Sequence, residues 1–380
     1  MPLLVTASAT PELANWSNLA LYSAMAVYTI AMLLFAAHLA ALGPDTEADA
    51  AAARAGADDL GDDLADDRAD ERADALVGAV AGSGAAGRTG GIGSGDGAAG
   101  PVRSTLPAAD GPRVGSSAAD EGSRGSLRAR KLGSTGMSMT WLASVLLLAS
   151  VVLRGLSVAR APWGNMFEFA TAGATVAAFA YLLLARRYRW EWLGIFVVGP
   201  ILLTLGTALL AFYTEAAELM PALKSVWLVI HVTVAILAVG LFIVAFGLGV
   251  AYLLKVRRDA AEVGTRSRRL AFLDSLPSAT RLERSAYGLN MVGFILWTFT
   301  LVAGAIWAQK AWGSYWTWDP KEVWTFVVWV VYAAYMHARA TAGWEPRKAM
   351  WIAIAAFATV IVNFAIVNVF FVGQHSYSGL

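Results

Sequence analysis

The sequence predicts an all-α polytopic membrane protein with about eight transmembrane helices and an external tryptophan-rich loop. Its 380 residues are 57% hydrophobic and only 15% charged, and their mean hydropathy is +0.55. Several apolar runs reach the roughly 20 residues that a helix needs to cross a bilayer. This composition excludes a soluble globular protein.

Eight apolar stretches have the length and hydropathy of membrane-spanning helices. They lie at about residues 19–42, 138–158, 166–185, 191–213, 226–254, 287–308, 322–342 and 348–371. No Lys or Arg precedes the first stretch, and it is longer than the apolar core of a typical signal peptide. We therefore expect an uncleaved first helix, with cleavage within residues 36–43 as the alternative.

Composition divides the chain into three parts. Residues 1–42 form an N-terminal transmembrane helix, residues 43–136 form a linker, and residues 137–380 form the main membrane domain. The linker is rich in Ala, Gly, Asp, Arg and Ser and contains no aromatic residue, so it cannot bury enough apolar surface to fold alone. We expect it to be disordered and cytoplasmic.

Lys and Arg cluster in alternate segments between the predicted spans. The clusters are RARK (128–131), RRYR (186–189), KVRR (255–258) with RSRR (266–269), and RATAGWEPRK (339–348). The positive-inside rule places them in the cytoplasm, so both termini and the loop after residue 308 lie outside the plasma membrane. With 29 basic and 28 acidic residues, the total charge gives no indication of nucleic acid as a partner. Membrane lipid is the expected surrounding.

The chain has no cysteine and only four histidines. Imidazole is therefore the strong ligand for a metal or a haem iron that remains. We expect His231 and His375 near the outer surface. His38 lies near the inner end of the first span, and His337 lies roughly 25 Å deep, counting 1.5 Å per residue from Pro320.

These depths predict two pairs of histidines on opposite sides of the bilayer, each able to supply both axial ligands of a haem. The alternative for each histidine is an interfacial side chain that forms hydrogen bonds with water or a carbonyl group. For His38 the sequence favours neither the haem-ligand nor the interfacial interpretation. No HExxH spacing is present, which disfavours a zinc enzyme.

The segment WGSYWTWDPKEVW, residues 312–324, joins a dense aromatic group to a polar end. Asp319, Pro320 and Glu322 have the spacing of a helix N-cap with a capping box. The aromatic density exceeds that of an ordinary interfacial belt, so we interpret it as a platform for a flat apolar ligand; the belt is the alternative. The candidate ligand-binding residues of the segment are Trp312, Tyr315, Trp316, Trp318, Asp319 and Trp324.

Together these motifs resemble the CcsA/ResC family of system II cytochrome c biogenesis, often called CcsB in actinobacteria. WGSYWTWDPKEVW is similar to the WWD signature of haem-handling proteins. VWLVIHV around His231, AAYMHAR around His337 and VGQHSYSGL around His375 occur in the family's order, and the resemblance covers about residues 138–380. Gln374 stands where the family pattern has Leu.

The resemblance implies a multi-pass protein that binds haem b, presents it at the outer membrane face and promotes its covalent attachment to apocytochrome c. It implies the membrane subunit of a holocytochrome c synthetase, or haem lyase, with a ResB-type partner and a thiol-reducing pathway. In the family the histidines matching His231 and His375 are external ligands of the haem iron, and the one matching His337 belongs to an intramembrane haem site. His38 is paired with His337 on predicted depth alone, with a partner's histidine as the alternative.

Other interpretations remain open from the sequence. Arg160 and Lys310 are rare external cations that would pair with haem propionates or extend to the membrane interface. A transporter of a small solute would use the histidines as a proton relay and would have broken helices, of which Gly199 and Pro200 give one sign. A scaffold protein would leave the paired histidines and the aromatic loop without a use.

Overall fold

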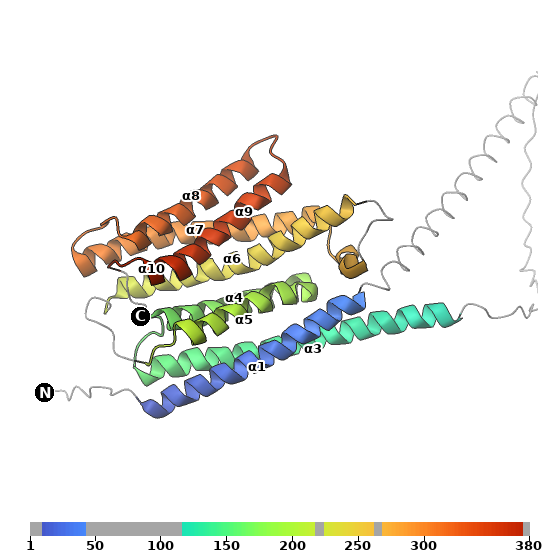
Figure 1. The fold of residues 1–380 in the computed structure, drawn as a ribbon, viewed down its shortest axis with the longest axis horizontal. Helices are drawn as coiled ribbons and strands as arrows, with labels where there is room; N and C mark the ends of the chain where they lie inside the picture. Colours follow the sequence, from blue (N-terminus) through green and yellow to red (C-terminus); the bar gives the residue numbers. More distant parts are fainter. Residues whose placement is uncertain (1–9, 43–115, 217–223, 262–267, 375–380) are drawn as a thin grey trace, which may run out of the picture. The chain divides into compact units, whose positions relative to one another are not determined.

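The computed structural model describes residues 10–42, 116–216, 224–261 and 268–374, with side chains described from residue 127 onward in the second segment. Every regular element in these segments is a helix (Figure 1). They are α1 (Pro11–Leu42), α3 (Ser116–Ser157), α4 (Met166–Tyr188), the 3-10 helix η1 (Glu191–Leu193), α5 (Gly194–Ala211), α6 (Val226–Asp259), the 3-10 helix η4 (Arg268–Ser275), α7 (Ala279–Trp312), α8 (Pro320–Ala340), α9 (Pro346–Ile361), the π-helix η5 (Val362–Val367) and α10 (Asn368–Phe370).

Seven segments of the described chain are long and apolar enough to cross a membrane. The all-α, multi-pass fold class is thus confirmed. The eighth expected span, residues 322–342, corresponds to α8, which has 21 residues but is not among the seven. Its Trp and Tyr side chains, His337 and Arg339 make it less apolar than the other helices. The fourth expected span is not broken, because α5 continues through Pro200.

Helix α6 is central to the packing of the described helices. It contacts α4, α5, α7 and α9, while α8 packs on α7 and α9 (Figure 1). Glycines permit these close contacts. The hydrophobic effect does not drive helices together in lipid, so close packing stabilises them instead, and small residues let the backbones approach. A Cβ added to Gly240 would lie 2.7 Å from Val176 of α4, and one added to Gly247 would lie 3.2 Å from the Phe196 carbonyl of α5.

Helices α1 and α3 are joined by hydrogen bonds between buried polar groups. Tyr28 Oη and Ser144 Oγ are 2.8 Å apart, and Ser17 Oγ donates to the Ser150 carbonyl at 2.8 Å. Helix α3 begins inside the stretch that the sequence assigned to the linker, because residues 116–136 are already helical. Phe35 of α1 packs against Gly136 in that part. The remaining linker residues, 43–115, lie outside the described residues.

A buried ion cluster fixes the connection between α3 and α4. Glu168 is fully buried and accepts from Arg154 Nε at 3.2 Å and from Arg160 Nη1 at 2.7 Å. The backbone N–H of Gly164 also donates to Glu168, at 2.8 Å. With its carboxylate paired on several sides, the cluster avoids most of the cost of burying a charge.

Replacing Glu168 with Gln should remove the carboxylate charge that the buried Arg154 and the partly buried Arg160 share. We expect a loss of about 3–5 kcal/mol in the free energy of unfolding, because one partner of a buried pair is removed. Denaturant unfolding of the purified protein in detergent measures this loss. The control is Glu12→Gln at an exposed site of α1; equal stability of the two variants would contradict the prediction.

Candidate functional site

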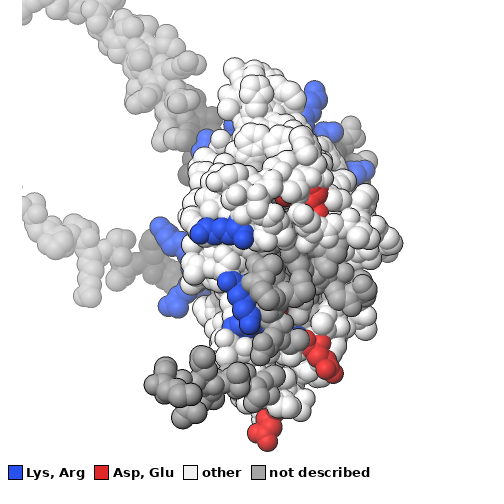
Figure 2. Space-filling model, turned by 90° about the vertical axis from the view of Figure 1, so that its left-hand side faces the viewer, with Lys and Arg blue, Asp and Glu red and all other residues white. Residues whose placement is uncertain are grey.

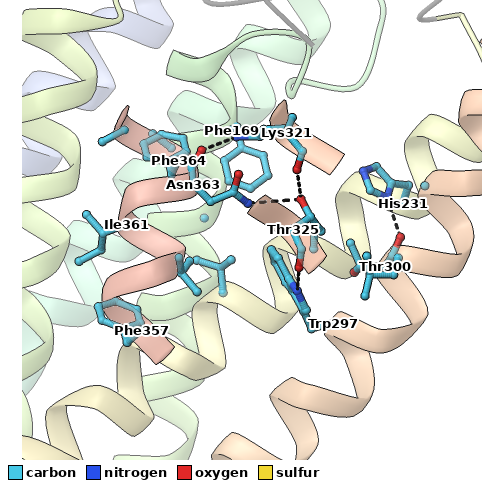
Figure 3. Close-up of a pocket in the computed structure, with 18 of the residues that line it drawn as sticks. Phe169, His231, Trp297, Thr300, Lys321, Thr325, Phe357, Ile361, Asn363 and Phe364 are labelled. Atoms are coloured by element: carbon cyan, nitrogen blue, oxygen red, sulfur yellow. Dashed lines mark hydrogen bonds between the residues drawn. The ribbon is translucent and has the colours of Figure 1, made fainter. Parts of the chain in front are cut away.

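A pocket with a volume of about 580 Å³ lies among α4 to α9 and the loop between α7 and α8 (Figure 3). This volume is within the range of roughly 300–1,000 Å³ that is usual for small-molecule sites. Most lining side chains are apolar, and Phe169 of α4 stacks on Phe364 of η5 with ring centroids 5.6 Å apart. The polar side chains on the wall are Thr204, Thr207, His231, Thr300, Lys321, Glu322, Thr325 and Asn363, together with Tyr315 and Trp316.

His231 is held on the pocket wall by a contact with α7. Its Nδ1 is 2.9 Å from the carbonyl oxygen of Thr300. Because a carbonyl only accepts, Nδ1 carries the proton and the lone pair is on Nε2, the tautomer that ligates a metal. A Cβ on Gly304 would lie 2.7 Å from His231 Cε1, so glycine at this position makes room for the imidazole ring.

The aromatic residues of the loop have three different positions. Tyr315 and Trp316 line the pocket. Trp312 packs edge-on against the buried Trp307, whose ring in turn stacks with His231 at a centroid distance of 6.0 Å. Trp318 is 78% exposed and touches Trp316 edge-on. Trp324 lies on α8 and is not part of the lining.

Asp319 has the predicted capping role and a second one. Its Oδ1 accepts from Lys321 N at 2.9 Å, and Glu322 accepts from Asp319 N at 3.2 Å, which completes the capping box. Asp319 Oδ2 also accepts from the backbone N–H of Gln374 at 2.6 Å. Thr317 Oγ1 donates to Gln374 Oε1 at 3.1 Å. The loop therefore anchors the chain directly before His375, which itself lies outside the described residues.

The structure does not bring His38 and His337 together. His38 is buried between α1 and α3, with its Nδ1 2.8 Å from the Ala129 carbonyl and its ring against Gly133. His337 is exposed on α8, and in Figure 1 α8 lies on the opposite side of the described helices from α1 and α3. The sequence predicted that the two histidines lie at a similar depth in the membrane, but depth says nothing about their separation in the membrane plane. The structure therefore gives no support to a haem shared by these two residues.

The structure distinguishes the cations that the sequence predicted on the outer side from the one that lines the pocket. Arg160 is paired with Glu168, and Lys310 is exposed in the last turn of α7; neither lines the pocket. Lys321 does line it, and its Nζ donates to the Asn363 carbonyl at 2.7 Å. Lys321 was not predicted as a site residue, because a capping box alone explains the Asp-Pro-Lys-Glu segment. Figure 2, a view onto the end that holds the α7–α8 loop, shows few charged side chains.

Comparison with known proteins identifies the family of this chain. Residues 134–375, which include the helices that line it, match the family model described as Cytochrome C assembly protein. The cytochrome c biogenesis protein CcsA of Prochlorococcus marinus (strain MIT 9303) is 34% identical over 259 residues, covering 62% of this chain and 81% of that protein. CcsA of Parasynechococcus marenigrum (strain WH8102) is 33% identical over 260 residues, covering 62% and 84%. The chain belongs to the cytochrome c assembly protein family.

Proposed function

We propose that this chain functions in c-type cytochrome biogenesis, where it binds haem at the outer membrane face and promotes its attachment to apocytochrome c. The family and the names of the relatives support cytochrome c biogenesis. The observation that carries the haem part is His231, an imidazole held in the Nε2-ligating tautomer on the wall of an apolar pocket of about 580 Å³. Haem b is the substrate that we assign to it.

The residues around the pocket have distinct roles under this proposal. His231 supplies one axial ligand, and His375 supplies the other from the segment that Asp319 anchors. Tyr315 and Trp316 cover the macrocycle from the loop. Two imidazole ligands leave no open position for oxygen, so the bound haem stays unreactive until an apocytochrome histidine replaces one of them.

Attachment then requires positioning and no nucleophile from this chain. Each thiol of the apocytochrome C-x-x-C-H motif adds across a vinyl group: an S–C bond forms, and the thiol proton is transferred to the other vinyl carbon. The addition consumes no oxidant, but the two thiols must arrive reduced. A chain without cysteine cannot reduce them, so we assign this task to a thiol-reducing pathway. The contribution of this chain is the fixed orientation of the reactants.

A ResB-type partner subunit is the expected source of the second inner ligand. His337 lies on an exposed stripe of α8 with Phe326, Val330 and Ala334, spaced by three or four residues along one face. Because His38 is held between α1 and α3, a histidine from another chain is the better partner for His337. We place the complex in the plasma membrane, with the α7–α8 loop outside.

Replacing His231 with Ala should remove most of the haem from the outer site, because the ordered axial ligand is lost. We expect the reduced wild type, purified with its partner, to show the absorption spectrum of a low-spin bis-imidazole haem, and the variant to show a weakened or shifted spectrum. His38→Ala is the control and should retain the wild-type spectrum. A wild type that binds no haem would contradict the proposal and favour the transporter.

Replacing Asp319 with Asn separates its two roles. The Asn side chain still accepts from Lys321 N as an N-cap, but it offers an NH₂ group to the Gln374 N–H in place of a charged acceptor. We expect a roughly tenfold to hundredfold weaker affinity for haem in a spectral titration, since hydrogen bonds to charged groups are worth about 1.5–3 kcal/mol. Ser314→Ala, which removes a bond within the same loop, is the control, and equal affinities of these two variants would contradict the anchoring role.

A further inference from the structure

Lys321 is the one lysine on the pocket wall, in the first turn of α8. Its Nζ donates to the backbone carbonyl of Asn363 at 2.7 Å, as Figure 3 shows. Within the described segments no carboxylate forms an ion pair with it. Asp319, two residues before it, is used by the backbone N–H groups of Lys321 and Gln374. Because this amine lies in a mostly apolar pocket and forms no ion pair within the described residues, an anionic ligand would stabilise its charged form.

Asn363 is a second polar group at the same place whose hydrogen-bonding capacity is under-used. The side chain is 5% exposed, and its Oδ1 has no hydrogen-bond partner in the described structure. Its Nδ2 has only a long contact, 3.4 Å, with Thr325 Oγ1. Asn363 lies in the π-helix η5, a type of helical turn that is frequent at functional sites. The amide can therefore orient a ligand that Lys321 attracts.

These two groups lie apart from His231 on the pocket wall (Figure 3). Apolar side chains form most of the rest of the wall, and Phe169 and Phe364 lie next to Asn363 (Figure 3). The pocket thus offers a metal ligand on one side, a cation with an amide on another, and a mostly apolar lining around them. A flat apolar ligand that carries both a metal and a carboxylate matches this distribution.

We propose that Lys321, together with Asn363, binds a propionate carboxylate of the haem. This inference rests on the proposed function and names the groups that would set the orientation of the substrate. The propionates and the vinyl groups of haem lie on opposite edges of the macrocycle. A propionate held at Lys321 therefore directs the vinyl edge away from α8.

The test compares haem with haem dimethyl ester, in which both carboxylates are neutral. Both are titrated into the purified full chain in phosphatidylcholine nanodiscs and followed by absorption. We expect the wild type to prefer haem over the diester by about tenfold to a hundredfold, the worth of a charge-assisted hydrogen bond. Lys321→Met should lose this preference while binding the diester as the wild type does, and Lys321→Arg should keep most of it. Lys310→Met, at an exposed lysine of α7, is the matched control and should behave as the wild type.

Unchanged binding of the diester shows that Lys321→Met is folded, so the comparison does not depend on a destabilised variant. If the wild type binds haem through His231 but has no preference over the diester, the carboxylate site is wrong and the proposed function stands. If the wild type binds neither porphyrin, the proposed function fails first. Phosphatidylglycerol nanodiscs test a lipid phosphate as the occupant of the site. Equal weakening of haem and diester binding in the wild type, but not in Lys321→Met, would assign Lys321 to lipid and overturn the proposal.

Discussion

The hydrogen bond from His231 to the Thr300 carbonyl is the contact on which the site depends, and it requires α6 and α7 to lie very close together. Gly304 makes this distance possible, because a Cβ there would lie 2.7 Å from the imidazole ring. Farther along the same pair of helices, a Cβ on Gly293 would lie 2.5 Å from Phe242. Close packing of α6 on α7 thus fixes both the tautomer and the direction of the His231 ring.

The polar end of the tryptophan-rich loop connects helix formation to the site. Asp319 and Glu322 start α8 through a capping box, and the same two carboxylates order the loop and the chain end by accepting from Gln374 N and Thr317 N. Pro320 has no backbone N–H, and at the first position of a helix that N–H would have no partner within the helix. One local interaction therefore sets the start of α8, the place of Lys321 on the pocket wall and the anchor of the segment before His375.

The sequence predicted features that depend on local pattern. Apolar length predicted the helices, and spacing predicted the capping box at Asp319. Lateral position depends on tertiary packing, which neither hydropathy nor depth encodes. His38 is therefore held by Ala129 and Gly133, away from His337, and Arg160 is paired with Glu168. Lys321 has an ordinary place in a capping sequence, and only the fold brings it close to Asn363.

Under the proposed function, the two haem sites differ in how much of each this chain builds. The outer pocket is formed by α4 to α9 and the loop, with His231 ordered by its own fold. His337 is on an exposed face of α8, and its backbone carbonyl accepts from the N–H and the hydroxyl of Thr341. An exposed imidazole on an apolar helix is costly in lipid unless another chain covers it. Under the proposed function, the inner site would therefore be an interface between α8 and a partner chain.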